Sequence, residues 1–233
     1  MEKIKINTRY KKLLADAITP VSIYLNIKEK YKKSFLLESS DYHGDEDSYS
    51  FICFNPVASF KVQDGKIFTV YPNGEFENKS AAENDVVKEL NKFSGLFDCE
   101  DLGFDFVTNG LFGFTSFEGV RHFEDIDFDY KEKPEKKVPD MHYMVFQNII
   151  SINHFKNELY LFEHRSEIGT GSGPESLDKL EEIIKTSNAT QKKFERVGEE
   201  ASNFDDSGYL KVIRDAKKHC KRGDVFQLVL SRE

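Results

Sequence analysis

The stretch SFKVQDGKIFTV, residues 59–70, does most to decide how this chain folds. Two runs typical of β-strands, SFKVQ and KIFTV, flank the pair Asp64-Gly65. Both positions of such a pair tolerate positive φ, which the tight turn between two antiparallel strands requires. The stretch therefore predicts an antiparallel β-hairpin.

Strand-like runs continue on both sides of this hairpin. Residues 34–39 and 49–54 predict a second antiparallel pair around an acidic loop, and residues 143–152 and 158–162 predict a third, with Asn157 in its turn.

Two further strands are predicted outside these pairs. Residues 110–114 form an aromatic run that contains glycines. Residues 21–27 alternate apolar and polar side chains, which is the period of a half-buried strand, and we expect Pro20 to begin it.

Helical spacing of apolar residues predicts helices among and after the strands. They are residues 83–94, 117–123, 174–186 with Pro174 in the first turn, and 206–222 with Asp205 or Asp206 as the N-cap. This mixture predicts an α+β fold of antiparallel, layered β-sheets with outer helices. The polar residues 187–203 predict a linker between a domain over residues 1–186 and the start of a second domain over 204–233.

The end of the chain, GDVFQLVLSRE (223–233), predicts a helix that stops at Gly223 and a strand-like run over residues 225–232. A strand that leaves the core without covering elements would be an exposed, adhesive edge. We therefore expect the chain to be part of a longer polypeptide.

Composition limits the classes of function. The chain has 233 residues, of which 39% are hydrophobic, so it can bury a core and wholesale disorder is excluded. A net charge of −8 argues against a phosphate-neutralising surface, so we expect neither nucleic acid nor an anionic membrane as a partner. No apolar run approaches the roughly 20 residues that cross a bilayer, and the N-terminus does not resemble a secretory signal, which predicts a cytoplasmic protein. Cys53, Cys99 and Cys220 are odd in number and far apart, which favours reduced, structural thiols.

No stretch carries a strong catalytic or metal-binding motif by itself. Residues 169–174, GTGSGP, match neither phosphate-binding glycine pattern, so a flexible loop is favoured over a nucleotide cradle. His154 and His164 could face each other across a hairpin, but hydrogen-bonded histidines are favoured over metal ligands. The acidic run 124–129 is typical of a solvated face. The residues alone therefore predict no metal site and no cofactor.

Three groups of segments, in order, resemble the N-terminal half of the anthranilate synthase component I family. LLES (36–39), YSFI (49–52) and Asn55-Pro56 are similar to one signature of that family. NGLFGF (109–114) followed by VRHFE (120–124) is similar to its glycine-rich strand and helix. GDVFQ (223–227) followed by VLSR (229–232) resembles the passage into its catalytic domain.

The resemblance implies an allosteric tryptophan pocket built from the early strands. Glu38 and Ser39 would lie near the ammonium and backbone groups of L-tryptophan, and Leu37 and Ser50 would shape the pocket. A carboxylate suits an ammonium group because charge-assisted hydrogen bonds are stronger than neutral ones.

The resemblance also implies what the whole enzyme would do. A glutamine amidotransferase subunit, component II, would supply ammonia that attacks chorismate, with assistance from Mg²⁺, and loss of pyruvate would give anthranilate. Gln227 would occupy an active-site position where water-using relatives carry a lysine, and glutamine cannot act as that base. The Mg²⁺ ligands and the acid and base residues would lie beyond residue 233, so we expect the isolated chain to be inactive.

Two alternatives stay open. Aminodeoxychorismate synthase component I belongs to the same superfamily and can retain a tryptophan pocket. A non-catalytic amino-acid-binding module is the alternative from a different functional class.

Overall fold

The computed structural model describes residues 3–16, 18–38, 48–82, 85–126, 138–169, 171, 173–186 and 194–233. The chain forms two compact units, Met1–Ala189 and Thr190–Glu233, which are described separately. Ser39, the acidic loop 41–47 and the charged segment 127–137 lie outside the described residues.

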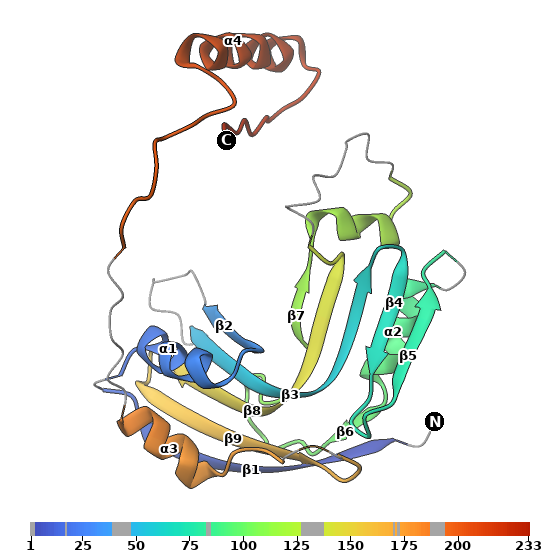
Figure 1. Ribbon diagram of the computed structural model, residues 1–233, viewed down its shortest axis with the longest axis vertical. Coiled ribbons are helices and arrows are strands. Elements are labelled where there is room, and N and C mark those ends of the chain that lie inside the picture. Colours follow the sequence, from blue (N-terminus) through green and yellow to red (C-terminus); the bar gives the residue numbers. More distant parts are fainter. Residues whose placement is uncertain are drawn as a thin grey trace. The chain divides into compact units, whose positions relative to one another are not determined.

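The described residues of the first unit form one sheet of nine strands (Figure 1). The strands are β1 (Ile4–Leu14), β2 (Ser34–Glu38), β3 (Tyr49–Gln63), β4 (Lys66–Val70), β5 (Phe76–Ser80), β6 (Phe97–Cys99), β7 (Phe112–Thr115), β8 (Met141–Asn153) and β9 (Glu158–Ser166). Their order is β5-β4-β3-β8-β9-β1-β6, with β2 also paired to β3 and β7 to β8. All pairs are antiparallel except the parallel pair of β1 and β6. The predicted α+β class with antiparallel strands is confirmed.

The long strands β3 and β8 connect the two halves of this sheet. The first part of β3 pairs with β2 and its last part with β4, while β8 pairs with β7 near its start and with β9 near its end. The register of β3 against β8 shifts between Pro56 and Ala58, next to Asn55, which has a φ of 60°. Figure 1 shows β3 bending along its length, which is the usual effect of a bulge.

The three predicted strand pairs are confirmed. Asp64 and Gly65 have φ values of 55° and 67° in the turn between β3 and β4, and Asn157 has a φ of 51° between β8 and β9. The pair formed by β2 and β3 has the register Leu37 opposite Phe51. Turn chemistry and alternation therefore identified the antiparallel core of the sheet.

The strand predicted at residues 21–27 is wrong, because this segment lies in the helix α1 (Pro20–Lys30). The Thr19 side chain accepts a hydrogen bond from the backbone N–H of Ser22, and Pro20 occupies the first turn. Ile23 and Ile27, four residues apart, are both fully buried. In so short a segment the apolar residues fit both the two-residue period of a strand and the 3.6-residue period of a helix. The helix forms because it buries Ile23 and Ile27 together against the sheet.

Four other helical segments follow. They are α2 (Val86–Ser94), the 3₁₀ helix η1 (Phe117–His122), α3 (Leu177–Lys185) and α4 (Asp206–Arg222). The predicted helices are confirmed, and the structure shows which residues cap the starts of α4 and α3. Asp205 caps α4. α3 begins after Ser176, whose side chain caps the backbone N–H of Lys179, so Pro174 precedes the helix instead of lying in its first turn.

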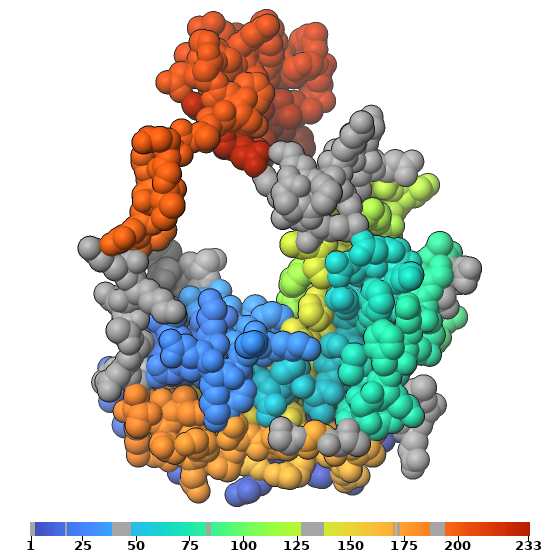
Figure 2. Space-filling model, viewed as in Figure 1, coloured from blue at the N-terminus to red at the C-terminus, as the bar shows by residue number. Residues whose placement is uncertain are grey.

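Three apolar clusters hold the first unit together. α1 and α3 cover one face of the sheet, where Ile23, Ile52, Ile150 and Leu180 pack together, and Figure 2 shows these two helices side by side. α2 covers the half of the sheet that contains β4. The third cluster is rich in aromatic side chains and includes partly buried side chains from residues 102–106.

The second unit consists of α4 and irregular segments on either side. The guanidinium of Arg232 lies 2.6 Å from the carboxylate of Asp206, and the N–H of Asn203 donates to the carbonyl of Glu233. None of residues 194–233 is buried. The strand predicted at residues 225–232 is wrong, since a strand needs a hydrogen-bonded partner and the described part of this unit supplies none.

All three cysteines are free thiols, as predicted, and burial raises the pKa of Cys53 far above its usual value. In the described ranges, no helix is both long and apolar enough to span a bilayer.

Candidate functional site

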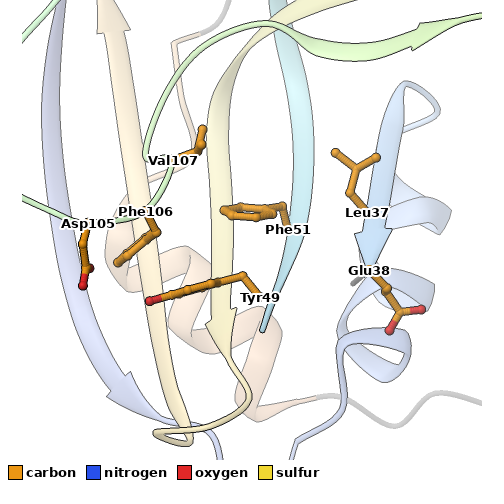
Figure 3. Close-up of a pocket in the computed structure, with 7 residues that line it drawn as sticks. All are labelled: Leu37, Glu38, Tyr49, Phe51, Asp105, Phe106 and Val107. Atoms are coloured by element: carbon orange, nitrogen blue, oxygen red, sulfur yellow. The ribbon is translucent and has the colours of Figure 1, made fainter. Parts of the chain in front are cut away.

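A pocket of about 500 Å³ opens beside the start of β3. It is lined by Leu37 and Glu38 of β2, Tyr49 and Phe51 of β3, and Asp105, Phe106 and Val107 of the segment before β7 (Figure 3). Its volume lies within the range of about 300–1,000 Å³ that is typical of small-molecule sites.

Strand pairing brings the two sides of the pocket floor together. Leu37 lies directly opposite Phe51 across the antiparallel pair of β2 and β3, so both side chains are on the same face of the sheet. Tyr49 lies two residues before Phe51 on β3 and shares that face. The sheet therefore presents an apolar surface to the pocket.

Aromatic rings form a stack along this surface. The ring centroids of Tyr49 and Phe106 are 4.8 Å apart with an interplanar angle of 25°, and those of Tyr49 and Phe51 are 6.1 Å apart at 22°. All three side chains are only partly buried. Such an arrangement suits a flat apolar molecule, which would cover ring area that now faces solvent.

The charged side chains of the pocket are both acidic. Glu38 ends β2 and Asp105 lies on the opposite wall, and both are exposed. Figure 3 shows the Glu38 carboxylate directed away from the aromatic rings, at the rim of the pocket. A ligand whose apolar part rests on the rings could therefore pair a cationic group with a carboxylate only where that group extends to the rim.

Two of the site residues predicted from the sequence line this pocket, and the others lie elsewhere or outside the described residues. Leu37 and Glu38 line the pocket together. Ser50 is fully buried and does not line it, because its hydroxyl forms a hydrogen bond of 2.7 Å with Nε2 of His154. Ser39 lies outside the described residues, and Gln227 is exposed in the irregular segment after α4, in the second unit.

Sequence reasoning did not propose five of the lining residues as site residues. Tyr49 and Phe51 lay within the quoted YSFI segment, so a signal for them was present. Asp105, Phe106 and Val107 were marked only by the short alternation of polar and aromatic residues in GFDFV (103–107). Their approach to β3 is a long-range contact that no local pattern predicts.

Two histidines are hydrogen bonded near the ends of β8 and β9. Nδ1 of His164 lies 2.9 Å from the hydroxyl of Thr8, and burial lowers the pKa of His164 to about 4. His154 is paired with Ser50 as described above. The prediction of hydrogen-bonded histidines is confirmed. Within the described residues, no group of three or more His, Cys, Asp or Glu side chains could hold a metal ion.

A second pocket of about 470 Å³ lies between β4, β5 and α2. Its charged side chains pair with each other: the ammonium of Lys79 lies 2.7 Å from Glu89 and 3.1 Å from Glu77. The Tyr71 hydroxyl donates to Glu77, and burial raises the pKa of Tyr71 to about 12. This network joins the hairpin to the helix, so its groups already have partners within the fold.

The comparison with family models defines the class of protein. Residues 32–233 match the model for chorismate binding enzyme, and the chain belongs to this family.

The most informative relatives are anthranilate synthases, which confirms the resemblance noted in the sequence. The chain is 30% identical over 237 residues to anthranilate synthase component 1 of Thermus thermophilus, covering 97% of this chain and 47% of the relative. It is 26% identical over 230 residues to the Lactococcus lactis protein of the same name, covering 96% and 48%. Aminodeoxychorismate synthase component 1 of Bacillus subtilis is 26% identical over 188 residues, covering 78% and 39%.

The chain spans about half the length of the curated relatives it matches. Among solved structures, the crystal structure of anthranilate synthase component I from Streptococcus pneumoniae TIGR4 is similar with a TM-score of 0.48 and 17% identity, covering 92% of this chain and 46% of that one.

Proposed function

We propose that the first unit of this chain is the tryptophan-sensing region of an anthranilate synthase component I enzyme. The observation that carries the proposal is the pocket beside β3. The LLES segment, which suggested a feedback site, supplies Leu37 and Glu38 to a pocket with an aromatic wall. The anthranilate synthase relatives, similar over almost the whole chain, support the same conclusion.

L-Tryptophan matches the chemistry of this pocket. Its indole ring would rest against Tyr49, Phe51 and Phe106, whose rings are partly exposed. Its ammonium group would lie at the acidic rim, next to Glu38. Ser50 would act indirectly, because its hydroxyl is engaged with His154 on the far side of β3 from the Phe51 ring.

In the whole enzyme, we propose that chorismate and ammonia from a glutamine amidotransferase subunit give anthranilate and pyruvate. Gln227 would belong to the active site of that enzyme. Mg²⁺ would assist the reaction, but the described residues contain no group that fits a metal site, so its ligands would come from elsewhere in the whole enzyme. A cytoplasmic location stays a prediction.

Aminodeoxychorismate synthase component I is the second candidate, because the Bacillus subtilis relative of that name is 26% identical to this chain. The two reactions differ in their products. Aminodeoxychorismate keeps the side chain that anthranilate formation eliminates as pyruvate. Assaying pyruvate release by an enzyme that carries this region with a complete catalytic region would separate the two candidates.

Titration of the 233-residue chain with L-tryptophan tests the regulatory proposal. The chain contains no tryptophan, so with excitation beyond the absorption band of tyrosine the indole fluorescence of the ligand can be followed by itself, and isothermal titration provides an independent measurement. We expect saturable binding. Glu38→Gln removes the charge but keeps the shape, and should weaken binding by roughly tenfold or more if a charge-assisted hydrogen bond of about 1.5–3 kcal/mol is lost.

Glu75→Gln is the matched control, because Glu75 is an exposed carboxylate in the turn between β4 and β5, outside the pocket. It should leave the Kd unchanged. Absence of binding to the wild-type chain, or equal weakening by both substitutions, would contradict the proposal.

A further inference from the structure

The segment between β6 and β7, residues 100–111, covers part of the aromatic face of the sheet without forming a helix or a strand. Two phenylalanines attach it. The ring of Phe104 lies 5.1 Å from that of Tyr10, and the ring of Phe106 lies 5.1 Å from that of Tyr160. Asp105, between them, is exposed. The segment is therefore held to the sheet by alternate aromatic side chains.

The two phenylalanines differ in two respects that bear on function. Phe106 lines the pocket, whereas Phe104 does not. The ring of Phe106 lies nearly parallel to that of Tyr49, at 4.8 Å and 25°. Phe104 instead meets Tyr10, Tyr160 and Phe162 edge-on, and its ring packs against Phe106 with the centroids 5.0 Å apart. Figure 3 shows Phe106 next to Tyr49, across from Leu37.

We propose that Phe106 is a specificity-determining residue of this pocket, which makes it selective for flat aromatic ligands over aliphatic ones of similar polarity. The inference rests on the proposed function and extends it to a segment that the LLES signature does not include. The ring of Phe106 extends the surface formed by Tyr49 and Phe51, so an aromatic ligand gains a third ring contact.

The physical basis is the difference between ring stacking and general apolar contact. Aromatic pairs with centroids about 4.5–7 Å apart gain a contribution beyond the area they bury. An aliphatic side chain in the pocket gains only the burial. Replacing Phe106 by leucine keeps an apolar wall but removes the ring, so it should affect aromatic ligands and spare aliphatic ones.

The experiment compares three variants of the full 233-residue chain. Phe106→Leu tests the proposal, Phe104→Leu is the matched control in the same segment, and Phe106→Tyr restores a ring. L-Tryptophan binding is measured by ligand fluorescence, and L-leucine is measured as a competitor. Thermal melting of each variant shows that it is folded.

We expect Phe106→Leu to raise the Kd for L-tryptophan by about 3- to 10-fold and to leave the competition constant of L-leucine within twofold. Phe104→Leu removes a ring that packs against Phe106 but does not line the pocket, so it should change the Kd for L-tryptophan less than Phe106→Leu does. Phe106→Tyr should restore tryptophan binding. These results would support a role in specificity, because a purely structural loss would weaken both ligands together.

Three results would overturn the inference. If the wild-type chain binds tryptophan but Phe106→Leu does not change the Kd, Phe106 does not set specificity, and the proposed function stands. The same holds if both ligands weaken equally, or if Phe104→Leu has the same effect. If the wild-type chain does not bind tryptophan, the proposed function fails and the inference fails with it.

Discussion

Replacing Gly113 with alanine tests how β7 is held against β8. A Cβ added at Gly113 would lie 1.9 Å from the carbonyl oxygen of His142 and 2.8 Å from Cα of Tyr143, all backbone atoms of β8. Ordinary contacts begin at 3.4 Å, so the strands would have to separate by about 1.5 Å. Neither atom belongs to a flexible side chain that could move aside.

The expected cost follows from this geometry. Overpacking of this kind typically costs about 1–3 kcal/mol, and each weakened backbone hydrogen bond between β7 and β8 adds about 1 kcal/mol. We expect Gly113→Ala to lower the free energy of unfolding by about 3 kcal/mol or more. For a unit of this size the Tm should fall by about 6–12 °C. Phe112, next to Gly113, packs against Phe51 of the pocket, so tryptophan binding should weaken as well.

The assay is thermal unfolding followed by circular dichroism, with Gly171→Ala as the control. A Cβ at Gly171 would meet nothing within 4 Å, and the Tm of this variant should stay within about 1–2 °C of the wild type. If Gly113→Ala melted as close to the wild type as Gly171→Ala does, the close approach of β7 to β8 would be refuted.

Three further predictions concern a buried histidine, a buried amide and turnover. Burial lowers the pKa of His164 to about 4 in the folded chain, against about 6.5 when unfolded, so the unfolded state takes up the proton first as the pH falls. The free energy of unfolding should therefore decline between pH 6.5 and 4, with at most about 3 kcal/mol of the decline due to this group. Urea unfolding should show a smaller decline in His164→Gln. Equal declines in the two proteins would contradict a buried, neutral His164. The Asn148 side chain donates to the backbone carbonyl of Glu175 at 2.9 Å and accepts from the backbone N–H of Glu175 at 2.8 Å. In urea unfolding, Asn148→Ala should lower the free energy of unfolding by about 2–3 kcal/mol, whereas Asn7→Ala, at an exposed position, should lower it by under about 0.5 kcal/mol. Similar losses in the two variants would contradict a stabilising role for these two hydrogen bonds. The 233-residue chain should yield no fluorescent anthranilate from chorismate, Mg²⁺ and ammonium, and activity that copurifies with the chain would refute its expected inactivity.

Elements with local signals could be predicted from the sequence alone. Asp64-Gly65 and Asn157 marked turns because their backbone tolerates positive φ, and both hairpins are present. Apolar spacing and Asp205 located α4. The motifs from LLES onwards indicated the family, and two residues of the first motif, Leu37 and Glu38, line the pocket; their role in binding tryptophan stays a prediction.

Features that depend on contacts between distant segments became visible only in the folded chain. Residues 21–27 became a helix because Ile23 and Ile27 bury together against the sheet, an outcome that a seven-residue alternation cannot distinguish from a strand. Residues 225–232 did not become a strand in the described unit, because alternation alone supplies no hydrogen-bonded partner. Ser50 faces His154 instead of lining the pocket, because successive side chains of a strand point to opposite faces. Phe106 joins the pocket through packing across more than 50 residues of chain from Tyr49, and such contacts follow from the whole fold, not from any local period.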